Sequence, residues 1–106
     1  MIITTTNRIE GRQITEYLGV VSAESVHGIN FVRDFFTGMR DFFGRRSQTL
    51  ERALKEARAE VTAEIRERAG ALRADAVVGV NFEISMPAGR GGRVVVFATG
   101  TAVRLN

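Results

Sequence analysis

The residues best suited to hold a ligand are Arg45 and Arg46, which directly precede Ser47 and a long segment with helical periodicity. Serine is a favoured first residue of helices, because its hydroxyl accepts a hydrogen bond from an N–H group of the first turn. The remaining N–H groups there lack acceptors inside the helix, and together with the positive end of the helix dipole they attract anions. We therefore treat Arg45, Arg46 and Ser47 as a candidate site for a small anion or nucleotide. The alternative is a connector between helices whose arginines pair with acids such as Asp34 or Asp41.

The sequence contains few residues of the types that bind transition metals. The chain has no cysteine and one histidine, His27, whereas zinc and copper sites use several imidazole or thiolate ligands. His27 lies at a predicted strand-to-helix junction, where we expect a partly buried structural residue. A symmetric oligomer could repeat His27 and Glu24 around an axis, but ring geometry seldom brings such positions onto one ion. The residues themselves predict no metal site and no cofactor.

Catalytic patterns are also missing. The serines considered as nucleophiles share a single histidine as their possible base, and none has nucleophile-elbow spacing: Ser22, Ser25, Ser47 and Ser85. Glu16 and Tyr17 could serve in acid–base chemistry, but strand alternation places them on opposite faces. No glycine pattern typical of nucleotide-binding loops is present. We expect a protein without enzymatic activity.

Length and composition favour one soluble globular domain spanning residues 1–106. The sequence is 44% hydrophobic and 25% charged, with a net charge of +3 and no block of five like charges, so nucleic acid is not an expected partner. No signal peptide is visible at the amino terminus. The longest apolar runs, 76–80 and 94–98, fall far short of the roughly 20 residues that a membrane span needs. We expect a cytoplasmic protein with no membrane contact.

Strand signals flank a central helical region. Residues 13–26 alternate and are rich in β-branched side chains, which predicts a long strand. Gly19 in its middle indicates a bulge, a bend or a close approach by another backbone. Residues 76–84 and 93–103 are rich in valine and enclose a glycine-rich turn, which predicts a hairpin. Residues 2–6 could add a short strand before a turn at Glu10-Gly11.

Two helices are expected between the strands. The first, 29–43, closes at Gly44 and presents an apolar face for the core or for another copy of the chain, formed by Phe31, Phe35, Phe36, Met39, Phe42 and Phe43. The second, 47–74, carries an apolar stripe at three- and four-residue steps, formed by Leu50, Leu54, Ala57, Val61, Ile65 and Leu72. Unbroken, the second helix would be about 40 Å long. Either Gly70 breaks it, or it overhangs and packs against a neighbouring subunit; we favour the neighbour.

These elements predict an α+β, two-layer domain in which one curved antiparallel sheet carries the long helix across one face. The excess of phenylalanine and the length of the second helix indicate a homo-oligomer, so the expected partner of the chain is itself.

Several motifs in one order resemble the landmarks of the YbjQ-like family, which is labelled a heavy-metal-binding domain family. They are Glu16-Tyr17-Leu18-Gly19-Val20-Val21, Arg33-Asp34-Phe35-Phe36, Arg46-Ser47, Ala57-Arg58 and Ala74-Asp75-Ala76-Val77-Val78-Gly79. The resemblance covers nearly the whole chain. It implies a dodecin-like β-α-β-β subunit in a ring-shaped homopentamer, and it implies no established catalytic activity.

The chain departs from the family pattern at several positions. Arg73 stands where a helix-ending glycine is common, and Asn81 and Glu83 stand where two aspartates are frequent. Losing a formal charge at Asn81 weakens any site for a hard cation there. The leading interpretation is a non-enzymatic, self-assembling domain of unknown ligand. The alternatives are a heavy-metal-binding or metal-response protein, as the family label indicates, and an anion or nucleotide binder acting through Arg45 and Arg46.

Overall fold

The computed structural model describes residues 1–28, 42–86 and 93–106, with side chains described for all of these except 42–49. Four strands and one helix form the described fold: β1 (Ile2–Ile3), β2 (Ile14–Gly28), α2 (Phe42–Ala71), β3 (Ala76–Ser85) and β4 (Arg93–Leu105). The predicted long strand and both hairpin strands are thus confirmed. Most of the predicted helix at 29–43, with Phe31, Phe35, Phe36 and Met39, lies outside the described residues.

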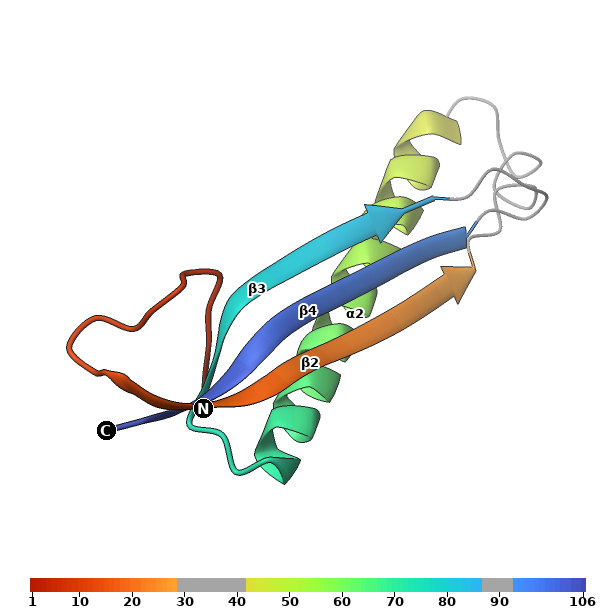
Figure 1. The fold of residues 1–106 in the computed structure, drawn as a ribbon. Coiled ribbons are helices and arrows are strands. Elements are labelled where there is room, and N and C mark those ends of the chain that lie inside the picture. The colour runs from red at the N-terminus through yellow and green to blue at the C-terminus, as the bar shows by residue number, and fades with distance from the viewer. Residues whose placement is uncertain (29–41, 87–92) are drawn as a thin grey trace.

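The strands form a single curved sheet in the order β1-β3-β4-β2. Figure 1 shows β3, β4 and β2 side by side. β4 pairs antiparallel with both β2 and β3, and its pairing with β3 is the predicted hairpin. β1 instead pairs parallel with β3, with Ile2 opposite Ala76 and Ile3 opposite Val77. The prediction of a wholly antiparallel sheet was therefore wrong: the sheet is mixed, because the amino-terminal segment runs alongside β3 in the same direction.

Glycine permits two irregularities in this sheet. Gly19 has a φ of 130° and lies where the pairing of β2 with β4 shifts register between Tyr17 and Gly19. This confirms the bulge predicted at Gly19. Gly79 has a φ of 62° within the β3 bulge between Val78 and Asn81. Both backbone conformations are strained for residues with a Cβ atom.

The helix boundaries differ from the prediction. α2 is one continuous helix of 30 residues that begins at Phe42, so Gly44 does not end a helix and Ser47 does not begin one. The helix also continues through Gly70. A single glycine inside a helix costs only about 1 kcal/mol relative to alanine, which packing against the sheet easily offsets. The favoured alternative, a helix unbroken at Gly70, was right, whereas both predicted bounds, 47 and 74, were wrong.

Arg73 ends the helix in a left-handed conformation, with a φ of 60°. The Arg73 N–H donates to the Gly70 carbonyl at 2.9 Å, and the Ala74 N–H donates to the Ala69 carbonyl at 3.0 Å. These two bonds make a Schellman motif, which usually has glycine at the left-handed position. Arginine therefore adopts here a conformation that glycine would adopt at lower cost.

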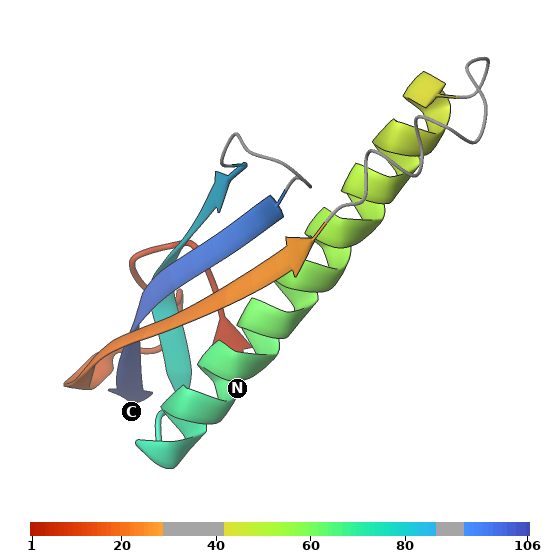
Figure 2. The same cartoon turned by 90° about the vertical axis from the view of Figure 1, so that its right-hand side faces the viewer.

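α2 lies across one face of the sheet, and its amino-terminal turns extend past the ends of the strands (Figure 2). The buried helix positions recur at every fourth residue: Ala53, Ala57, Val61, Ile65 and Ala69. Three belong to the predicted stripe, whereas Leu72 is 42% exposed because it follows the last helical residue. Alanine at this interface lets the helix approach the sheet closely. Within the described ranges, no helix is both long and apolar enough to span a membrane.

The face of the sheet that points away from α2, here called the outer face, is covered only at one end by described residues. There Ile9 and Ile14 pack on a buried cluster formed by Ala76, Val78, Val103 and Leu105. Farther along the same face, Val20 is 77% exposed, Val26 53% and Phe97 37%. The described residues thus bury one face of the sheet and leave much of the other open.

Candidate functional site

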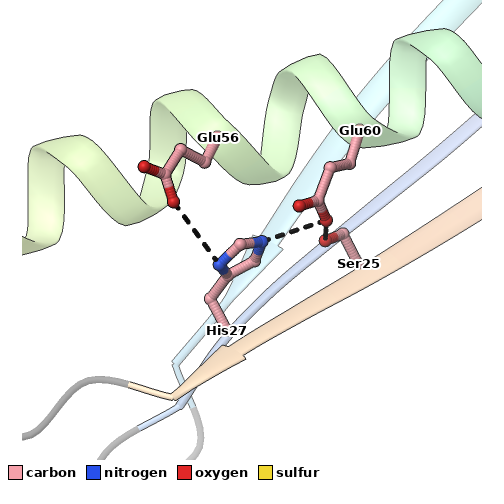
Figure 3. Close-up of polar contacts among 4 residues, drawn as sticks. All are labelled: Ser25, His27, Glu56 and Glu60. Carbon is pink, nitrogen blue, oxygen red and sulfur yellow. Dashed lines mark hydrogen bonds and ion pairs between the residues drawn. The ribbon is translucent and has the colours of Figure 1, made fainter.

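The most connected group of polar side chains lies between the end of β2 and the middle of α2. Ser25 and His27 are two residues apart on β2, so both side chains point toward the helix. The Ser25 hydroxyl donates to the Glu60 carboxylate at 2.5 Å, and His27 Nε2 lies 3.0 Å from the same oxygen, Oε2 (Figure 3). Glu60 therefore joins helix to strand through two side chains at once.

The second imidazole nitrogen of His27 faces another carboxylate. His27 Nδ1 lies 4.0 Å from Oε2 of Glu56, which stands one helical turn before Glu60 (Figure 3). Because a carboxylate only accepts hydrogen bonds, the contact with Glu60 places a hydrogen on Nε2. The imidazole is thereby held in one orientation between two acids. Its side chain is 20% exposed, which agrees with the partly buried histidine expected from the sequence.

These contacts act on the acidity of Glu60. Its pKa lies below the ordinary value of 4.5, chiefly because the Ser25 hydroxyl donates to the carboxylate and secondly because His27 does. Desolvation acts in the opposite direction and is outweighed. The Glu60 side chain is 59% exposed, so water screens the cluster and limits its electrostatic strength.

The described geometry of the cluster does not converge on one point as the ligands of a metal ion do. Zinc requires nitrogen and oxygen ligands about 2.0–2.2 Å from one point, whereas the two nitrogens of His27 face different carboxylates. Among the described residues, no three His, Cys, Asp or Glu side chains are placed to hold an ion together. Glu24, considered with His27 for a symmetric site, lies three residues away on β2 and hence on the opposite face of the sheet.

Nor does the cluster have the geometry of a catalytic triad. A serine nucleophile needs a hydrogen bond from its hydroxyl to a general base such as histidine. Ser25 instead donates to Glu60, and its residue is only 7% exposed. In this arrangement the side chains fasten α2 to the end of β2 and orient the imidazole.

One premise of the predicted anion site at Arg45, Arg46 and Ser47, a helix that begins at Ser47, is wrong. α2 begins at Phe42, five residues before Ser47, so the N–H group of Ser47 lies beyond the first four of the described helix. Ser47 is therefore not an N-cap. The side chains of these three residues lie outside what the structure describes, as do those of Phe42 and Phe43.

Sequence reasoning singled out His27 but missed its partners Glu56 and Glu60. Their four-residue spacing places both carboxylates on one face of a helix, and this signal was available. Which strand residue they face depends on how α2 is placed along the sheet, and the helical stripe alone does not fix that placement. Asn81 and Glu83, which stand where the family often has two aspartates, contact each other: the Asn81 side-chain amide lies 3.5 Å from a Glu83 oxygen.

Comparisons with known proteins show to which family the chain belongs. The family model YbjQ_1, described as "Putative heavy-metal-binding", matches residues 1–106. A UPF0145 protein of Pseudomonas fluorescens is 77% identical over 105 residues, covering 99% of both chains. A UPF0145 protein of Actinobacillus pleuropneumoniae is 50% identical over 103 residues, covering 97% of both.

A solved structure shows the same fold. A protein of unknown function from Pediococcus pentosaceus, assigned to the DUF74 family, superposes with a TM-score of 0.69 at 19% identity. The match covers 100% of this chain and 98% of the other. The solved structure shows the fold, and the family model and the curated relatives show that the chain belongs to the YbjQ-like family.

Proposed function

We propose that the chain is a non-enzymatic domain that assembles with copies of itself, as a ring-shaped homopentamer of dodecin-like subunits. The observation that carries the proposal is the outer face of the sheet, where Val26 of β2 and Phe97 of β4 stand exposed as diagonal neighbours and Val20 is exposed farther along β2. Exposed apolar patches on soluble domains mark interaction surfaces. The number five and the ring rest on the resemblance to the YbjQ-like family.

The shape of the subunit supports assembly. Its radius of gyration is 17.6 Å, whereas a compact domain of this length is expected near 13 Å. β2 is the last strand of the sheet, and within the described residues its outer edge has no partner strand. A long unpaired edge strand is a template for pairing with another chain.

Charge on the outer face favours a head-to-tail contact. Phe97 lies between Glu24 on β2 and Glu83 on β3 in the sheet register. If this face met the same face of a second copy, carboxylates would approach carboxylates, which is repulsive. A contact between two different surfaces avoids this repulsion, and repeated around an axis it closes a ring.

Light scattering coupled to size-exclusion chromatography tests the proposal. We expect a mass near five times 11.7 kDa for the wild-type protein. Val20→Glu and Phe97→Glu should lower the mass while circular dichroism keeps the wild-type spectrum, because both positions are exposed in the single subunit. Leu72→Glu, which changes an exposed residue beyond the end of α2, is the control and should keep the wild-type mass. A wild-type mass near 12 kDa at micromolar concentration would contradict assembly.

Heavy-metal binding, as the family description has it, is the weaker alternative. Each nitrogen of His27 faces a different carboxylate, so a cation at either nitrogen would have two protein ligands, the imidazole and Glu56 or Glu60. Four-coordinate zinc sites use three or four protein ligands. We therefore expect zinc and copper to bind weakly and without a defined stoichiometry. A saturable, submicromolar isotherm in calorimetry that disappears in His27→Ala would favour the metal function instead.

A further inference from the structure

A concave surface lies away from the Ser25–His27–Glu60 cluster, at the other end of β2. It is an open cleft of about 1360 Å³ between the amino-terminal segment, the start of β2 and the last described residue. Its polar lining includes Thr4, Thr6, Arg8, Glu10, Arg12 and Asn106, and its apolar lining includes Ile2, Ile9, Ile14 and Tyr17. A cleft with an apolar wall and a few convergent polar groups is the usual form of a small-molecule site.

The two arginines of the cleft are fixed by a tight turn. The Arg12 N–H donates to the Ile9 carbonyl at 3.3 Å, and Gly11 supplies the φ of 83° that this turn requires. Ile9 packs on the sheet, so the turn is anchored. Arg8 and Arg12 flank the anchored turn on its two sides. Guanidinium groups on a fixed backbone are well suited to grip a phosphate or carboxylate.

The rest of the cleft is also ordered by hydrogen bonds. The Thr6 hydroxyl donates to the Arg8 carbonyl at 2.7 Å, and Thr4 Oγ1 and Thr6 Oγ1 lie 2.9 Å apart. Arg12 Nη2 donates to the backbone oxygen of Asn106 at 3.0 Å, which leaves its other N–H groups to a ligand. Arg8 makes no ion pair with another described residue. The side chains of Arg8, Arg12 and Glu10 give the lining a net charge of +1, so an anion is favoured over a cation.

Tyr17 adds an aromatic surface to this charged cleft. Its side chain is 71% exposed, although Tyr17 stands inside β2. Covering such a ring with a flat apolar group gains hydrophobic and stacking energy. We infer that the cleft formed by Arg8, Arg12 and Tyr17 binds a small organic anion with a planar ring, of which a nucleoside monophosphate is the simplest representative.

This inference is independent of self-assembly, and adenosine monophosphate (AMP) is the probe that tests it. Calorimetric titration of the full chain should give one saturable site per subunit, and adenosine and inorganic phosphate should each bind at least roughly tenfold more weakly, because each lacks one of the two contacts. Arg8→Gln should weaken AMP binding roughly tenfold or more. Tyr17→Leu should weaken it too while leaving the affinity for phosphate unchanged.

Arg58→Gln is the matched control, since Arg58 is an exposed arginine on α2 outside the cleft lining; it should bind AMP like the wild type. Light scattering on each variant shows that its assembly is unchanged, which separates failure of this site from failure of the oligomer. No AMP binding up to about 10 mM, a range that would detect even millimolar affinity, would overturn the inference. So would wild-type affinity in Arg8→Gln, or inorganic phosphate binding as tightly as AMP.

Discussion

Replacing Gly100 by alanine tests the packing of the sheet directly, because the added methyl group has no room. A Cβ atom at Gly100 would lie 2.6 Å from Val77 Cγ1 and 2.9 Å from Val80 Cγ2, both well inside van der Waals contact. Val77 is fully buried and Val80 is 4% exposed, and β-branched side chains have few rotamers to which they can move. Val78 O, which would lie 3.4 Å away, belongs to the backbone and cannot give way easily.

The magnitude follows from two opposing effects. Overpacking a core by one methyl group costs about 1–3 kcal/mol. Replacing glycine also lowers the entropy of the unfolded chain, which returns about 0.4–1 kcal/mol where the backbone conformation is compatible. We therefore expect Gly100→Ala to lose about 1–2 kcal/mol of unfolding free energy.

Gly70→Ala is the matched control within the same chain. A Cβ atom at Gly70 would have no neighbour within 4 Å, and Gly70 lies inside α2. The same chemical change should therefore stabilise the protein by about 0.5–1 kcal/mol. The assay is urea unfolding followed by circular dichroism at one fixed protein concentration, because the stability of an oligomer depends on concentration. If Gly100→Ala were as stable as the wild type, the close packing of β3 and β4 described above would be refuted.

Two further predictions concern charge and helix termination. The folded-state pKa of Glu60 is lowered, so its carboxylate stabilises the fold at pH values above the ordinary pKa of 4.5. This stabilisation is lost as the pH falls through the lowered folded-state pKa. Urea unfolding should thus show Glu60→Gln to be less stable than the wild type at pH 7 and equally stable near pH 2; a difference that persists unchanged at pH 2 would contradict this. Arg73→Gly should raise the unfolding free energy by about 0.5–1 kcal/mol, because glycine adopts the φ of 60° without strain. Arg66→Gly, inside α2, is its control and should lower the unfolding free energy by a similar amount. Loss of stability in Arg73→Gly would mean that the Schellman geometry is wrong.

The strands could be predicted from the sequence because their signals are local. Alternation and valine content located β2, β3 and β4 to within two residues of their observed bounds, and Gly19 marked a real bulge. The parallel pairing of β1 could not be predicted in this way. Two residues carry no direction signal, and their partner strand lies more than seventy residues later in the chain.

The helix shows where local signals mislead. Gly44 and Ser47 have the residue types of a helix end and a helix start, yet α2 runs through both. Such preferences are worth about 1 kcal/mol each, less than the burial of the stripe from Ala53 to Ala69. The predicted stripe did not include Ala53 and Ala69, because alanine contributes little to a hydrophobic pattern. In the structure Ala69 is nevertheless buried as completely as Ile65.

The candidate sites were harder to predict, because each depends on residues brought together by the sheet register. His27 contacts Glu60 only because β2 and α2 run side by side, and Arg8 lines one cleft with Tyr17 only because the amino-terminal turn lies beside the start of β2. These two groups lie at opposite ends of one 15-residue strand, with the exposed residues of the outer face between them. Changes at distant, unconnected sites add independently. Glu60→Gln should therefore alter stability without altering AMP binding, whereas Phe97→Glu, six residues from the partner of Tyr17 on β4, should alter assembly alone.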